Sequence, residues 1–80
     1  MRLDKYLKVS RIIKRRTIAN EACDAGKVSV NGKIARASYD VKIGDTIEIQ
    51  MGAKVIKVIV TAVAETVRKE QASDMYKISE

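Results

Sequence analysis

Seven basic side chains are concentrated in the first sixteen residues, where they could together bind an anion. These residues are Arg2, Lys5, Lys8, Arg11, Lys14, Arg15 and Arg16, and a single acid, Asp4, lies among them. From residue 17 onward nine basic and nine acidic residues balance, so the net charge of +6 belongs entirely to this segment. Charge of one sign gathered in one short segment indicates a polyanionic partner, above all a nucleic acid.

Arg15 and Arg16 stand immediately before a predicted second helix, which is a suitable place for a phosphate group. The first amides of a helix lack partners within the helix, and this end carries about half a positive charge. We expect Thr17 to cap the helix, with side chains and amides converging on one anion. Asp4 is predicted either to orient a neighbouring arginine through a bidentate pair or to act as a first-turn carboxylate favoured by the helix dipole.

Two short helices are predicted to position these groups. In the first helix the apolar side consists of Leu3, Tyr6, Leu7 and Ser10. The second helix follows Thr17 and is expected to end at Gly26. Its predicted packing face consists of Ile18, Ala19, Ala22, Cys23 and Ala25.

The period changes after the second helix and predicts a small antiparallel sheet. Asn31-Gly32 within residues 27–34 is a strong hairpin signal. Residues 46–51 alternate, Gly52-Ala53 forms the next turn, and residues 55–63 are rich in β-branched side chains. In the tail, Ala72, Met75 and Tyr76 have helical spacing. The sequence therefore predicts an α+β domain, with two N-terminal helices packed on a small antiparallel β-sheet and a short C-terminal tail whose spacing fits a helix.

Composition argues against several classes of protein. The chain has no His and one Cys, and its spacing shows no metal-ligand cluster or paired carboxylates, so we expect no enzyme activity, metal or cofactor. No apolar run approaches the roughly 20 residues of a membrane span, and no signal peptide is recognisable. We therefore expect a cytoplasmic protein without a membrane partner.

The scarcity of aromatic residues favours the recognition of folded RNA by shape and phosphate contacts. Modules that read single strands stack bases on aromatic rings, and the chain has three Tyr with no Phe or Trp. Tyr39 is the one stacking candidate. A DNA-binding helix-turn-helix over residues 3–25 is an alternative, although Glu21 and Asp24 would be repelled by phosphates in a major groove.

Several short segments in a fixed order resemble the S4 RNA-binding domain. They are Arg2-Leu3-Asp4-Lys5-Tyr6-Leu7, Arg11, Lys14-Arg15-Arg16-Thr17, Ala19, Glu21-Ala22, Gly26 to Gly32, and Val41-Lys42-Ile43-Gly44-Asp45. The resemblance spans about residues 1–52 and implies an αL RNA-binding motif, in which two helices and a hairpin hold structured RNA. It implies an S4-type domain over residues 1–64 and a C-terminal tail over residues 65–80.

The charge pattern and this resemblance together predict an RNA-binding surface. Its predicted members are Arg2, Lys5, Lys8, Arg11, Lys14, Arg15, Arg16, Thr17, Asn20, Lys27, Asn31 and Lys33, with Asp4 in a supporting role. Scattered lysines such as Lys54, Lys57, Lys69 and Lys77 are predicted to be solvated surface residues.

A motif that starts at Met1 and fills most of the chain is similar to the stand-alone S4 proteins of the heat-shock protein 15 and RqcP group. This resemblance implies binding to ribosomal RNA and tRNA on the large (50S) ribosomal subunit carrying peptidyl-tRNA. It implies a role in ribosome-associated quality control, where a tailing factor would be a partner in C-terminal tailing of the nascent chain. An accessory role in large-subunit assembly would use the same surface, and we expect a monomer in either case.

Overall fold

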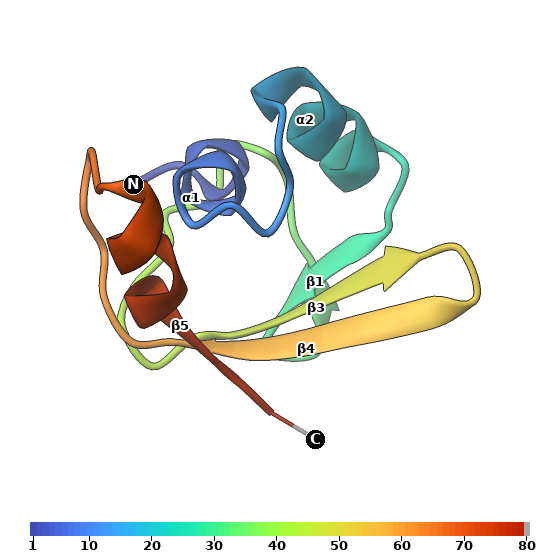
Figure 1. The fold of residues 1–80 in the computed structure, drawn as a ribbon. Coiled ribbons are helices and arrows are strands. Elements are labelled where there is room, and N and C mark those ends of the chain that lie inside the picture. The colour runs from blue at the N-terminus through green and yellow to red at the C-terminus, as the bar shows by residue number, and fades with distance from the viewer. Residues whose placement is uncertain (80) are drawn as a thin grey trace.

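Two helices lie on one face of a five-stranded antiparallel sheet in the computed structural model, which describes residues 1–79 (Figure 1). The helices are α1 (Leu3–Val9) and α2 (Arg16–Asp24). The sheet has the order β2-β1-β3-β4-β5, and its strands are β1 (Val28–Val30), β2 (Lys33–Ile34), β3 (Thr46–Met51), β4 (Lys54–Val60) and β5 (Tyr76–Ile78). A 3₁₀ helix, η1 (Lys69–Met75), precedes β5. The predicted α+β fold class is confirmed.

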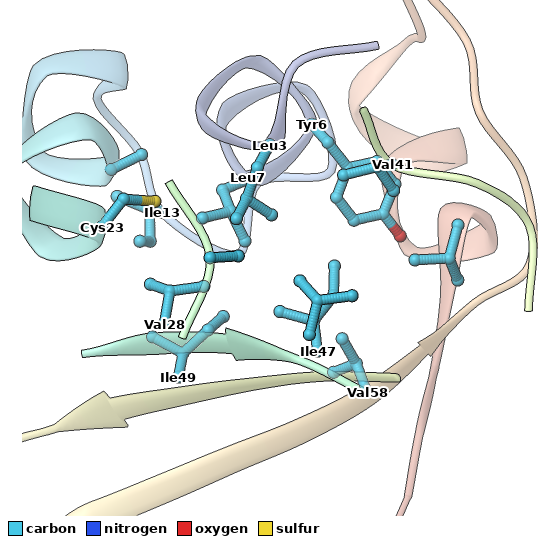
Figure 2. Packing of buried hydrophobic residues seen from close by; sticks show 14 of the residues in the cluster. Leu3, Tyr6, Leu7, Ile13, Cys23, Val28, Val41, Ile47, Ile49 and Val58 are labelled. Atoms are coloured by element: carbon cyan, nitrogen blue, oxygen red, sulfur yellow. The ribbon is translucent and has the colours of Figure 1, made fainter. Parts of the chain in front are cut away.

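The core lies between α1 and the inner face of the sheet (Figure 2). Leu3, Tyr6 and Leu7 are fully buried, as the periodicity of the first helix predicted. They pack in one cluster with alternate residues of β3, Ile47 and Ile49. One side of each element is therefore used for burial, which leaves the outer side of α1 for other contacts.

Helix α2 begins earlier than predicted, and this changes the role of Thr17. The helix starts at Arg16, and the N-cap residue is Arg15, which is extended and makes no side-chain cap. Thr17 therefore lies inside the first turn, and the predicted Thr17 cap is wrong. The helix ends as predicted, because Gly26 has a φ of 74°, and its amide and that of the next residue bond back to α2 carbonyls.

The packing face of α2 is narrower than predicted. Ala19 and Cys23, one helical turn apart, are buried, whereas Ile18 is 49% exposed and Ala25 is exposed. Successive residues of a helix are rotated by about 100° around its axis. Ile18, which directly precedes Ala19, therefore lies to the side of this line of contact and faces solvent. Burial raises the pKa of the Cys23 thiol to about 11, so this thiol remains protonated.

Both predicted turns are present in the sheet. Asn31 and Gly32 have φ values of 52° and 84° and connect the paired residues Val30 and Lys33, which is the geometry that Asn-Gly favours. Gly52-Ala53 joins β3 to β4. Strand β4 ends at Val60 rather than at residue 63, because the amides of residues 61 and 62 bond to the Met75 carbonyl instead.

The tail packs against the core. Ala72 and Met75 of η1 are buried, as their helical spacing predicted, but Tyr76 belongs to β5 and pairs with Val60. Strand β5 was missed, because three residues are too few to show a period. The hydroxyl of Tyr6 donates to the Met75 carbonyl at 2.6 Å and fixes η1 beside α1. Consequently α1 lies between α2 and η1 (Figure 1).

No helix within residues 1–79 is long and apolar enough to cross a membrane. The same residues contain no group of three or more His, Cys, Asp or Glu side chains that could hold a metal ion.

Candidate nucleic-acid interface

A buried carboxylate organises the basic residues at the junction of α1 and α2. The side chain of Asp4 is 3% exposed. It accepts hydrogen bonds from Arg2 Nε at 3.1 Å and Nη2 at 3.4 Å, and from Arg16 Nε at 3.3 Å. The Asn20 side-chain amide (3.3 Å) and the Lys5 backbone amide (2.8 Å) complete its shell. Asp4, Arg2, Arg16 and Asn20 are called the Asp4 cluster below.

The Asp4 cluster keeps its carboxylate ionised. Burial alone would raise the pKa of Asp4, but hydrogen bonds from Asn20, Arg2, Arg16 and the Lys5 amide outweigh burial and hold this pKa below 3.8. Asp4 holds Arg2 through Nε and Nη2 and holds Arg16 through Nε, while the two arginine side chains remain 52% and 47% exposed to solvent. Two guanidinium groups held by one carboxylate leave a net positive charge with oriented donors, which suits a phosphate.

The backbone around the cluster offers one helix end to an anion. At the start of α1, the amides of Leu3 and Asp4 donate to the carbonyls of Tyr39 (2.8 Å) and Ala37 (3.2 Å). The loop that follows β2 therefore occupies this end of α1. Helix α2 begins without a side-chain cap. Its first amides are therefore without a side-chain cap, and Arg16, which is held by Asp4, is the first residue of the helix.

The remaining residues of the predicted surface separate into different places. Thr17 and Asn20 line a shallow hollow of about 370 Å³ with Asp4, Arg16 and Glu21. Lys8, Arg11 and Lys14 line another groove beside the tail. This groove and the first hollow have no lining residue in common. Lys5 forms an ion pair with Glu65 of the tail, and Arg15 is exposed at the start of α2.

Of the three hairpin residues predicted for the RNA-binding surface, two are exposed and the third is bonded within the protein. Lys27 and Lys33 are exposed, but both polar atoms of the Asn31 amide are used within the protein. Its Nδ2 donates to Asp45 at 3.1 Å, and its Oδ1 accepts from the Thr46 amide at 3.0 Å. The structure thus gives Asn31 the role of tying the hairpin turn to the start of β3.

Tyr39 is half-buried rather than available as a stacking platform. Its ring packs against the core, and its hydroxyl donates to Asp45 at 3.1 Å. The same Asp45 accepts from the Lys42 amide at 2.9 Å. Burial would raise the pKa of Asp45, but these bonds and that from Asn31 lower it.

One exposed basic residue beside the hairpin was missed. Arg36 lines a hollow of about 660 Å³ with Lys33 and residues of the following loop. Its signal in the sequence was a single basic residue in a polar, irregular segment, which has no period to indicate the direction of its side chain. Only the fold shows that it adjoins Lys33.

Comparison with known proteins gives consistent matches. The S4 domain family model matches residues 1–47. The RQC P-site tRNA stabilizing factor of Halalkalibacterium halodurans is 55% identical, over 98% of this chain and 89% of that protein. The factor of the same name from Bacillus subtilis is 53% identical, over 98% of this chain and 91% of that protein.

Solved structures agree with these relatives. Heat shock protein 15 of Vibrio cholerae, described as trimeric, superposes with a TM-score of 0.92 at 31% identity, over 99% of this chain and 81% of that chain. The resemblance to the RqcP and heat-shock protein 15 group that the residues suggested is confirmed. This protein belongs to the S4 domain family, among the RQC P-site tRNA stabilizing factors.

Proposed function

We propose that this protein binds RNA on the large ribosomal subunit and stabilises P-site tRNA during ribosome-associated quality control. The observation that carries the proposal is the Asp4 cluster, which holds two arginines in fixed positions beside the uncapped start of α2. Two relatives whose matches cover 98% of this chain are named RQC P-site tRNA stabilizing factors, and these names support the assignment to P-site tRNA.

The proposed recognition is of phosphates on folded RNA. Arginine side chains whose Nε is already fixed lose less conformational freedom when they bind a phosphate. The proposed surface has Arg2, Arg16, Thr17 and Asn20 at its centre, and Lys27, Lys33 and Arg36 extend it at the hairpin. Tyr39 is packed into the protein, which further favours recognition of shape over stacking of single-stranded bases.

The finer steps of the function belong to the same proposal. The RNAs are large-subunit ribosomal RNA and peptidyl-tRNA, and the protein holds this tRNA while a tailing factor acts on the nascent chain. No cofactor and no catalytic step is required of the protein itself. The DNA-binding alternative is disfavoured, because Glu21 and Asp24 are exposed along α2 and would face phosphates in a major groove.

The test is RNA cross-linking in growing cells, followed by sequencing of the attached RNA. Arg16→Ala is compared with Lys54→Ala, which removes the same charge from an exposed position at the start of β4. We expect large-subunit RNA together with tRNA for the unchanged chain and for Lys54→Ala, and loss of both for Arg16→Ala. Large-subunit RNA without tRNA would favour the assembly role, and no enriched RNA would contradict RNA binding.

A further inference from the structure

A second basic hollow lies where the end of α1 and the connection to α2 face the tail. It is a groove of about 440 Å³ between the end of α1 and the tail. Its lining residues are Lys8, Val9, Arg11, Lys14, Glu65, Thr66, Val67 and Lys69. Four of these residues are basic and one is acidic, so the groove carries positive charge. No residue of the Asp4 cluster contributes to it.

Arg11 occupies a backbone position that is unusual for its residue type. It ends α1 with a φ of 62°, in the left-handed region where glycine is preferred, and its amide donates to the Lys8 carbonyl at 3.0 Å. Helix α2 ends with a glycine, Gly26, in the same conformation. An arginine there costs roughly 1 kcal/mol relative to glycine. Strained residues of this kind are concentrated at functional sites, and here the side chain lines the groove.

The wall of the groove formed by the tail is held in place by η1, which packs into the core. Lys69 is the first residue of η1, whose last residue, Met75, is buried and bonded to Tyr6. Its sequence environment predicted a solvated lysine. Lys69 is exposed as predicted, and it lines the same groove as Arg11, although the two are fifty-eight positions apart in the chain.

We propose that this groove is a second site for RNA phosphates, so that the protein contacts two separate stretches of RNA backbone. The proposal rests on the RNA-binding function proposed above and divides that surface into two sites. Four cations in one groove can neutralise several phosphates of a nucleic-acid backbone, and two of them, Arg11 and Lys14, belong to the basic connection between α1 and α2. An acidic peptide is the competing occupant.

Glu65 acts as an internal competitor at this groove. Its carboxylate pairs with Lys5 and lines the wall beside Val67 and Lys69. A carboxylate in this position repels a phosphate and occupies a lysine that could otherwise contact RNA. The affinity of the groove for RNA is therefore set below its maximum, and removing the charge of Glu65 should raise it.

The test measures the affinity of the full chain for a fluorescein-labelled RNA hairpin at several salt concentrations. The variants are Arg11→Gly, which removes the guanidinium and relieves the backbone, and Lys69→Ala, with Lys54→Ala as the control of equal charge change. Each groove variant should weaken binding roughly tenfold. Each should also reduce the slope of log affinity against log salt by about 1, whereas Lys54→Ala should leave both nearly unchanged. Thermal unfolding checks that Arg11→Gly is at least as stable as the unchanged chain.

The outcomes separate this inference from the proposed function. Loss of affinity in Arg16→Ala with none in Arg11→Gly and Lys69→Ala would keep the RNA-binding function and overturn the groove. No loss in any of the three would overturn both. Glu65→Gln should bind the hairpin more tightly and with a steeper salt slope. Groove variants that lose a poly-glutamate peptide but keep the hairpin would assign the groove to an acidic peptide instead.

Discussion

Arg16 at the start of α2 donates its Nε to Asp4 Oδ2 on α1 at a distance of 3.3 Å. A buried carboxylate of the first helix therefore sets the direction of an arginine on the second. The same carboxylate accepts from Arg2 through both of its oxygens, from Nε at Oδ1 and from Nη2 at Oδ2. The orientation of both guanidinium groups depends on one acidic residue inside the most basic segment of the chain.

Replacing Asp4 should reveal this dependence. Asp4→Asn raises the net charge by one, and a purely electrostatic argument predicts tighter RNA binding. We expect weaker binding, because Arg2 and Arg16 lose the charged partner that orients them, and a loss of about 1–3 kcal/mol in the free energy of unfolding. Affinity for a labelled RNA hairpin and chemical denaturation measure the two effects. Tighter binding by the variant would show that orientation is unimportant.

The same residue should make stability depend on pH in acid. The pKa of Asp4 is lowered in the folded protein, where hydrogen bonds overcome the effect of burial, so the folded state favours the ionised form. Its contribution is fully present above the ordinary pKa of 3.8 and is lost as the pH falls through the lower pKa of the folded state. We expect the stability difference between the unchanged chain and Asp4→Asn to be constant near neutral pH and to shrink below about pH 4. A difference that persists unchanged in acid would argue against the ion pairs as its source.

The tail should be part of the cooperative fold. Met75 is 1% exposed in the core cluster, and truncating a buried methionine costs about 2–5 kcal/mol, so Met75→Ala should lower the unfolding midpoint strongly. Ile78→Ala is the control, because this side chain of β5 is 58% exposed and should change stability by about 0.5 kcal/mol or less. Equal effects of the two substitutions would mean that η1 does not pack as described.

Substitution of Asn31 should distinguish a structural role of this residue from a direct contact with RNA. Asn31→Gly tolerates the positive φ of the turn but removes the two side-chain hydrogen bonds, to Asp45 and to the Thr46 amide. We expect a loss of about 1 kcal/mol in stability with little change in RNA affinity. An affinity loss in a variant of unchanged stability would instead restore Asn31 to the binding surface.

The sequence carried enough information for the local elements. The spacing of Leu3, Tyr6 and Leu7 predicted α1 and its buried side, and Asn31-Gly32 predicted the first hairpin, because these signals lie within a few residues of one another. The sequence also indicated that Asp4 could orient a neighbouring arginine, without showing which one. The structure shows that both arginines share this carboxylate.

What sequence reasoning missed depends on distant contacts. Strand β5 exists because Tyr76 pairs with Val60, and Lys69 lines the groove because Met75 packs against α1. Ile18 fits a helical pattern but faces solvent, because the line of contact of α2 is only one or two side chains wide. The local segment alone therefore does not decide whether these residues are paired, buried or exposed.

The bond between Tyr6 and Met75 joins residues separated by 69 positions, and the amides at the start of α1 bond to residues 37 and 39. The N-terminal helix, which begins directly after Arg2 and carries Asp4, is therefore completed by segments made much later during synthesis. Closure of these long loops must precede the contacts of α1 with residues 37, 39 and 75. A nascent chain that lacks residues 69–78 has the basic segment but not the bond from Tyr6 to Met75 that fixes η1 beside α1, so we expect α1 to reach its final packing only near the end of translation.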